Sequence, residues 1–227
     1  MNRWLLNFDV RVSKEQYVAM DWPKELRVEF LLRPEIIWTL SVDKRVWPSV
    51  FWHTTHREPL LSKYPTIDVN PHVDGYDWLN LDRMRAHYDA HRALAPGGVF
   101  VGIELLSEQA AEGEMLYESP VGIQCGITLD PTVPACPPAG STLLGYDVAD
   151  PGRTSGLTNC GYTEEEHRTL APVWGPRLNS FGLFSSLDDA AAFRQICNDR
   201  VPEHAPFWVY ALWRLPFLIT SAGLPLH

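Results

Sequence analysis

Cys160, in a glycine-containing loop, is the side chain of this chain with the clearest potential for covalent chemistry. It lies just before the sequence Thr-Glu-Glu-Glu, which predicts the N-terminus of a helix. Amide dipoles at a helix N-terminus lower the pKa of a nearby thiol and favour the nucleophilic thiolate. A Cys-dependent hydrolase or transferase built on this thiol would use His167 or His204 as its base. Asp147 or Asp150 would orient the imidazole.

The charge around Cys160 opposes such an enzyme. Three successive carboxylates, Glu164 to Glu166, follow the cysteine at the predicted helix start. Negative charge near a thiol raises its pKa, which is the opposite of what a nucleophile needs. No family signature of a cysteine enzyme surrounds this position. The thiol-dependent enzyme is therefore the alternative hypothesis, and a protein without catalytic activity is favoured.

His87 and His91 have a spacing that suits metal binding. They are four residues apart in a segment that predicts a helix from 80 to 95, so both imidazoles fall on one side. Tyr88 occupies the position where metalloprotease helices carry a glutamate, and His91 also belongs to the apolar stripe. The glycine clusters lack the spacing of a P-loop or a dinucleotide-binding loop. We therefore expect no cofactor and no metal, with His87 and His91 as the weak metal alternative.

The loop that contains Cys160 is positioned by a predicted strand before it and a predicted helix after it. Alternation of residues 142–149 indicates the strand, and Asp150 begins the loop. Pro-Gly, Ser-Gly and Asn-Cys-Gly then supply residues that tolerate turn geometry. Thr163 and Glu166 have the spacing of a capping box, which predicts a helix over 164–171. Pro172 and Pro176 are expected to make the chain beyond this helix irregular.

The other elements are indicated by apolar periodicity. Further strands are predicted over 8–12, 26–32, 36–42, 46–53, 99–106, 121–129 and 207–215. The strand over 99–106 is apolar on both faces apart from Glu104, and the strand over 207–215 is apolar on both, so both are expected inside a sheet. A further helix begins after Ser186, which has the side chain of an N-cap.

Strands and helices recur without regular βαβ alternation, which predicts an α+β fold with a mixed, mainly antiparallel sheet and a few helices. The N-terminal half is expected to be rich in β-structure. A length of 227 residues suits a single domain over 1–227, with a β-rich subdomain 1–75 and an α+β subdomain 76–227 as the alternative division.

The composition excludes several classes of partner. The formal net charge is −9 and no basic run occurs, whereas nucleic-acid binding needs clustered Lys and Arg. The most apolar late segment, 207–220, is interrupted by Arg214 and Pro216 and falls short of the ~20 residues that a membrane helix needs. We therefore expect neither a nucleic-acid partner nor a membrane.

The cysteines and the N-terminus favour a cytoplasmic protein. Four scattered cysteines show no metal spacing and are too few for a disulfide framework, so reduced thiols are expected. Cys125 and Cys197 lie in apolar patterns that predict burial in the core. The apolar run at the N-terminus is too short for a signal peptide.

Aromatic and acidic residues occur together around the loop, and this combination is typical of protein interfaces. Tyrosine and tryptophan anchor interfaces, while carboxylates select a basic partner. Trp208 adds a further aromatic side chain in the same half of the chain. The predicted partner-binding residues are Tyr146, Asp147, Asp150, Tyr162, Glu164, Glu165, Glu166 and Trp174.

Two segments of the last 85 or so residues resemble a known group of proteins. They are Leu-Leu-Gly-Tyr-Asp-Val-Ala-Asp at 143–150 with Ser-Gly-Leu-Thr-Asn-Cys-Gly-Tyr at 155–162, and Gly-Leu-Phe at 182–184 with Arg-Val-Pro-Glu-His-Ala-Pro-Phe-Trp-Val-Tyr at 200–210. Both resemble bacterial immunity proteins encoded beside secreted antibacterial toxins of type VI and polymorphic systems. The resemblance implies a cytoplasmic protein that binds one cognate toxin, and acidity suits a basic toxin such as a nuclease. It implies no catalytic residues.

Overall fold

The computed structural model describes residues 1–11, 81, 85, 99–111, 113–118, 120–122, 124–129, 135–151, 155–157 and 163–216. The strands predicted within 26–53 lie outside the described residues, as does most of the β-rich segment 1–75. The predicted metal pair, His87 and His91, lies outside them as well, and so do Cys160 and Tyr162.

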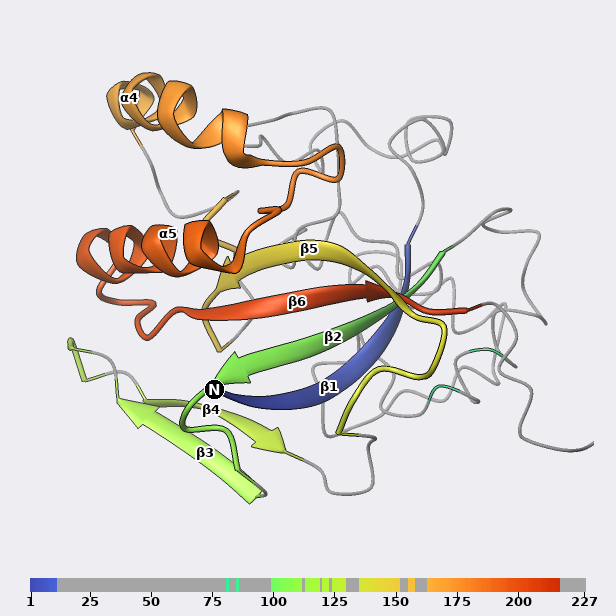
Figure 1. The fold of residues 1–227 in the computed structure, drawn as a ribbon. Coiled ribbons are helices and arrows are strands. Elements are labelled where there is room, and N and C mark those ends of the chain that lie inside the picture. Colours follow the sequence, from blue (N-terminus) through green and yellow to red (C-terminus); the bar gives the residue numbers. More distant parts are fainter. Residues whose placement is uncertain are drawn as a thin grey trace, which may run out of the picture.

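A four-stranded sheet forms the centre of the described structure (Figure 1). Its strand order is β1-β2-β6-β5, and each neighbouring pair is antiparallel. The strands are β1 (Asn2–Arg11), β2 (Val99–Ser107), β5 (Thr142–Ala149) and β6 (Trp208–Arg214). β2 and β6 were predicted to lie inside a sheet because both of their faces are apolar, and the strand order confirms this. A strand that has a neighbour on each side and packing on each face is shielded from water, so apolar residues suit both faces.

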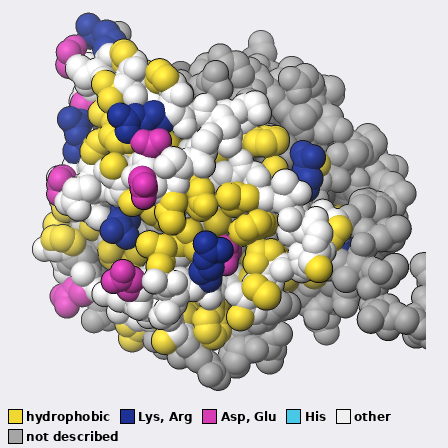
Figure 2. Space-filling view, in the orientation of Figure 1, with side chains coloured by type: hydrophobic (Ala, Val, Ile, Leu, Met, Phe, Trp, Pro, Cys, Tyr) yellow, Lys and Arg dark blue, Asp and Glu magenta, His cyan; other side chains and the backbone are white. Residues whose placement is uncertain are grey.

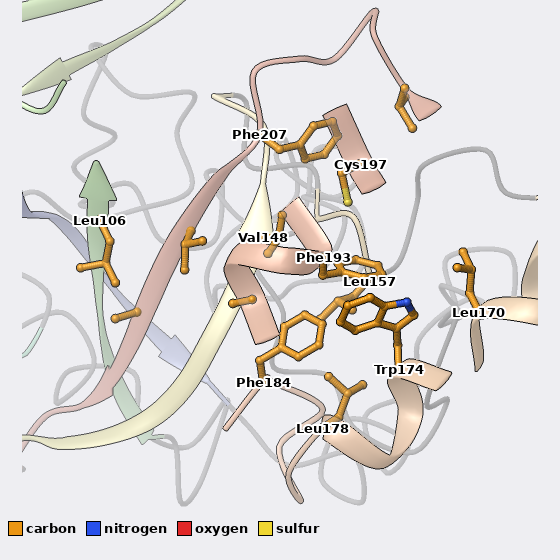
Figure 3. Close-up of a cluster of buried hydrophobic side chains, with 14 residues drawn as sticks. Leu106, Val148, Leu157, Leu170, Trp174, Leu178, Phe184, Phe193, Cys197 and Phe207 are labelled. Carbon is orange, nitrogen blue, oxygen red and sulfur yellow. The ribbon is translucent and has the colours of Figure 1, made fainter. Parts of the chain in front are cut away.

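Two helices pack against one face of this sheet. α5 (Leu187–Arg200) lies over β5 and β6, and α4 (Glu164–Trp174) with the 3₁₀ helix η3 (Gly175–Arg177) lies beyond it (Figure 1). Figure 3 shows the aromatic rings of Trp174, Phe184 and Phe193, the last of which belongs to α5, close to one another. Their ring centroids are 5.1 to 6.0 Å apart in tilted and edge-on arrangements, which suit the aromatic quadrupole.

A two-stranded hairpin packs against the opposite face. It consists of β3 (Gly113–Glu118) and β4 (Gln124–Leu129), and Met115 and Leu129 join the core that β2 and β6 form on that side. Tyr117 meets Trp208 edge-on with 4.2 Å between ring centroids. The strand predicted over 121–129 is three residues shorter, and the sequence analysis has no strand at 113–118. β3 has only two apolar residues that face the core, Met115 and Tyr117, and these are too few to predict a strand from periodicity. Its packing against the larger sheet stabilises the strand.

The helix caps confirm the local prediction. Thr163 accepts a hydrogen bond from the Glu166 amide, and the Glu166 carboxylate accepts one from the Thr163 amide. Ser186 caps α5 by accepting from the Asp189 amide. The predicted end of α4 at residue 171 is too early, because the helix accommodates Pro172 and ends at Trp174, where η3 follows. The described elements confirm an α+β fold with a mainly antiparallel sheet.

Gly156 lies in close contact with α5 in the loop after β5. Its amide donates to the Val148 carbonyl at 2.8 Å, and a Cβ at this position would overlap the Cys197 sulfur. Cys197 is fully buried, as predicted. The chain can therefore follow the surface of α5 closely only because this residue lacks a side chain.

We predict that Gly156→Ala lowers the free energy of unfolding by about 1 to 3 kcal/mol, because the added methyl overpacks a closed core. Cys197→Ala removes the sulfur, and the double variant should then be more stable than Gly156→Ala alone. Urea unfolding of the two single variants and the double variant measures this coupling. If the losses of the two single variants simply add in the double variant, steric overlap with Cys197 is not the cause.

Candidate functional site

The C-terminal end of β5 brings together the acidic residues that the sequence analysis singled out. Asp147 is fully buried, and its Oδ1 accepts hydrogen bonds from the Ser155 hydroxyl at 2.7 Å and the Val148 amide at 2.8 Å. The Ser155 hydroxyl oxygen in turn accepts from the Leu157 amide at 3.0 Å. A buried carboxylate is stable only with such partners. Asp147 therefore ties the loop after β5 to the end of the strand.

Asp150 forms a carboxylate–imidazole pair with His204. Its Oδ2 lies 2.7 Å from His204 Nδ1, with the Asp150 side chain 8% exposed and the His204 side chain 44% exposed. The Tyr210 hydroxyl donates to the Asp150 carbonyl oxygen at 3.2 Å, which fixes the backbone that carries the carboxylate. Within the described residues, His204 Nε2 has no hydrogen-bond partner. A carboxylate on Nδ1 holds an imidazole so that Nε2 can act as a base.

The sequence analysis predicted two histidines and two aspartates as alternatives for a base and its orienter, and the structure shows which of these are in contact. His204 and Asp150, which were one of the predicted base and orienter combinations, are in contact. Asp147 accepts a hydrogen bond from the Ser155 hydroxyl. The side chain of His167 and the whole of Cys160 lie outside what the structure describes. The described part therefore contains a carboxylate–imidazole pair, and it does not place a nucleophile beside this pair.

Three of the residues expected on a binding surface are instead buried. Asp147 is 0% exposed, Asp150 is 6% exposed and Trp174 is 8% exposed, and the further aromatic residue Trp208 is 4% exposed. Trp174 is covered because its ring completes the core under α5, and Arg177 stacks on it with 4.6 Å from Cζ to the ring centroid. Asp150 is largely buried against His204, while Tyr146 is half-buried on the sheet. Only exposed side chains can contact a partner directly, so the surface placement of these residues is corrected.

The carboxylates at the start of α4 are largely paired within the protein. Hydrogen bonds from the Thr163 amide and hydroxyl lower the pKa of Glu166, which also forms an ion pair with Arg200. Glu165 lies 3.2 Å from Arg168 one helical turn later. On the face in Figure 2, acidic and basic side chains are interspersed around hydrophobic ones. The predicted strongly negative loop therefore has most of its described charge compensated.

Glu104 is a buried polar residue whose environment the sequence analysis did not foresee. It lies in the middle of β2, is 1% exposed, and accepts a hydrogen bond from Trp213 Nε1 at 2.8 Å through Oε2. Its second oxygen, Oε1, has no hydrogen-bond partner. Burial raises the pKa of the Glu104 carboxyl, against the smaller opposing effects of Trp213 and of the Arg3 charge. The signal in the sequence is a single acid in an otherwise apolar strand.

An open pocket of about 350 Å³ lies at the opposite end of the sheet. Val99, Phe100 and Leu215 give it an apolar lining, and Arg214 is the charged side chain among its described lining residues. It holds no acid–base pair among those residues.

Within the described part of the chain, no group of three His, Cys, Asp or Glu residues is placed to hold a metal ion. None of the helices described is long and apolar enough to cross a membrane.

Comparison with protein-family models, curated protein sequences and solved structures found no match for this chain. The candidate sites therefore depend on the geometry above: the Asp150–His204 pair, the buried Glu104, and the surface of the hairpin.

We predict that Glu104→Gln raises the melting temperature at neutral and alkaline pH. The raised pKa of Glu104 means that the folded state retains this proton more strongly than the unfolded state does. Wild-type stability therefore falls as the pH rises above the ordinary pKa of 4.5 and through the folded value. Gln carries no charge to desolvate and should not show this fall.

Circular dichroism melting between about pH 4.5 and pH 8 checks this expectation. The difference between Glu104→Gln and wild type should grow with pH to about 2 to 4 °C, which corresponds to about 1 kcal/mol for a chain of this size. Glu118→Gln, at an exposed position, controls for the change in net charge. A difference that is the same at all pH values would contradict the effect of burial.

Proposed function

We propose that this protein is a cytoplasmic immunity protein that binds one cognate antibacterial toxin and neutralises it by stoichiometric occlusion. The resemblance of residues 143–162 and 182–210 to immunity proteins supports the class of protein. The net charge of −9 supports a basic toxin, such as a nuclease that must itself bind phosphate. An inhibitor of this kind covers the active site of the toxin and needs no catalytic residues of its own.

The observation that carries the proposal is the distribution of charge in residues 99–151. This segment contains eight carboxylates and no Lys, Arg or His. They are Glu104, Glu108, Glu112, Glu114, Glu118, Asp130, Asp147 and Asp150. Of these, Glu108 and Glu118 are exposed, and neither forms an ion pair with another residue that the structure describes. Uncompensated charge of one sign accelerates association with a partner of the opposite sign.

Co-expression tests the proposal directly. The toxin gene adjacent to the gene of this protein is expressed in a bacterial host with and without the protein, and survival is counted. We expect protection, a one-to-one complex of the purified proteins, and an association rate that falls by about tenfold or more between low and physiological salt. Growth arrest that the protein does not relieve, together with no complex on size-exclusion chromatography, would refute the function.

The Asp150–His204 pair favours a second candidate, a hydrolase or transferase that uses Cys160. In such an enzyme His204 would remove the thiol proton, and Asp150 would keep Nδ1 protonated and the ring oriented. This candidate requires Cys160 to be reactive at neutral pH, which the immunity proposal does not.

Iodoacetamide labelling at neutral pH, followed by mass spectrometry, separates the two candidates. Cys136 is an exposed free thiol and serves as the internal control. The enzyme candidate predicts that Cys160 reacts about tenfold faster than Cys136, and that His204→Ala removes the difference. Equal rates at the two thiols would eliminate the enzyme candidate and leave the immunity proposal unaffected.

A further inference from the structure

We propose that the outward face of the β3–β4 hairpin is the surface on which the basic toxin docks, with Leu116 as its anchor. This inference rests on the proposed function, which supplies the partner. It differs from the binding surface predicted from the sequence, which centred on the loop after β5.

The alternation of β3 places Leu116 on the solvent side of the hairpin. Met115 is 8% exposed and belongs to the core on the inner face, and Tyr117 packs on Trp208. Successive residues of a strand point to opposite faces, so Leu116 and Glu118 share the outer face. Leu116 is 68% exposed, the highest value among the four exposed large hydrophobic side chains of the described residues.

Gly126 keeps the side of Leu116 open. The two residues are directly opposite each other in the β3–β4 ladder. A Cβ at position 126 would lie 3.0 Å from Leu116 Cδ2, so any side chain there would press on the leucine and cover it. Glycine in a strand weakens the strand, and such a position often marks a place where another surface approaches closely. Leu116 therefore lies opposite a residue without a side chain, and its own side chain remains exposed.

The hairpin holds this leucine on a rigid support. β3 and β4 pair continuously from Gly113 and Leu129 to Glu118 and Gln124, and the inner face is fixed by packing on the main sheet. An anchor that is already ordered loses little conformational entropy on binding, which increases the affinity it contributes.

The charge beside Leu116 identifies the chemistry of the partner. Glu118 follows it on the same face, Val121 is 57% exposed just beyond the strand, and Glu108 is exposed before the hairpin. Neither glutamate forms an ion pair within the described part of the chain, and residues 99–151 contain no Lys, Arg or His. Leu116 and Glu118 thus place an exposed apolar side chain and a carboxylate on one strand face, a combination that suits an interface. A Lys- or Arg-rich surface with an apolar depression fits it.

The chain offers a matched control on another face. Val173, on α4, is 52% exposed, and on the same helix Glu165 is paired with Arg168 and Glu166 with Arg200. Leu116→Arg and Val173→Arg add the same charge to two exposed apolar positions. Only the first change removes the proposed anchor and places a cation against a basic partner.

The experiment uses the full chain and the purified product of the adjacent toxin gene, with binding measured by surface plasmon resonance. We expect Leu116→Arg to weaken binding by about 30-fold or more, as hot-spot substitutions do, and Val173→Arg to change it by less than about threefold. Glu118→Lys should act mainly on the association rate, and its effect should shrink at high salt.

The outcomes separate the two proposals. If wild-type protein neither binds nor protects, the proposed function fails. If wild type protects and Leu116→Arg binds as tightly as Val173→Arg, the hairpin is not the docking surface and only this inference is overturned. Leu116→Ala, which removes the anchor without adding charge, and the melting temperature of each variant exclude loss of folding as the cause of weaker binding.

Discussion

The insertion of β6 between β2 and β5 is the constraint on which the described structure depends. This strand comes last among the described elements, yet it pairs with both neighbours and contributes side chains to both cores. Val209 and Ala211 pack under α5, while Tyr210 and Leu212 pack toward the hairpin. The same strand carries Trp213 to Glu104 and the Tyr210 hydroxyl to Asp150. Both polar sites of the sheet therefore exist only after this long-range pairing has formed.

The three buried or nearly buried carboxylates show how differently a low-dielectric interior treats similar groups. Asp147 has a hydroxyl and an amide as partners, and these replace the water that it loses. Asp150 has an imidazole at 2.7 Å that is itself partly exposed. Glu104 has one donor for two oxygens, so burial raises its pKa. The first residue holds the loop, the second contacts an imidazole, and the third is expected to lower stability as the pH rises through its raised pKa.

The distribution of ion pairs explains why we propose the β3–β4 hairpin, and not the start of α4, as the docking surface. The carboxylates that begin α4 are conspicuous in the sequence, but Arg168 pairs with Glu165, and the capping box and Arg200 engage Glu166. Glu108 and Glu118 are scattered in the sequence and lie in a segment that supplies no cation. A cluster of charge in sequence therefore says little about the field around a protein until the partners of each charge are known.

Local physical chemistry allowed the sequence by itself to determine the caps of Thr163 and Ser186, the strands at 142–149 and 208–214, the burial of Cys197 and the α+β class. Each of these depends on neighbours within a few residues, or on an apolar pattern that has one plausible destination. The extra strand at 113–118, the burial of Asp147 and Trp174, and the pairs Asp150–His204 and Glu104–Trp213 were decided only by the tertiary structure. Their partners are 54 and 109 residues apart in the two pairs, and periodicity carries no information about such contacts. Which carboxylate is paired, and which apolar residue is exposed, depends on strand order and register, and these follow from the packing of the whole sheet.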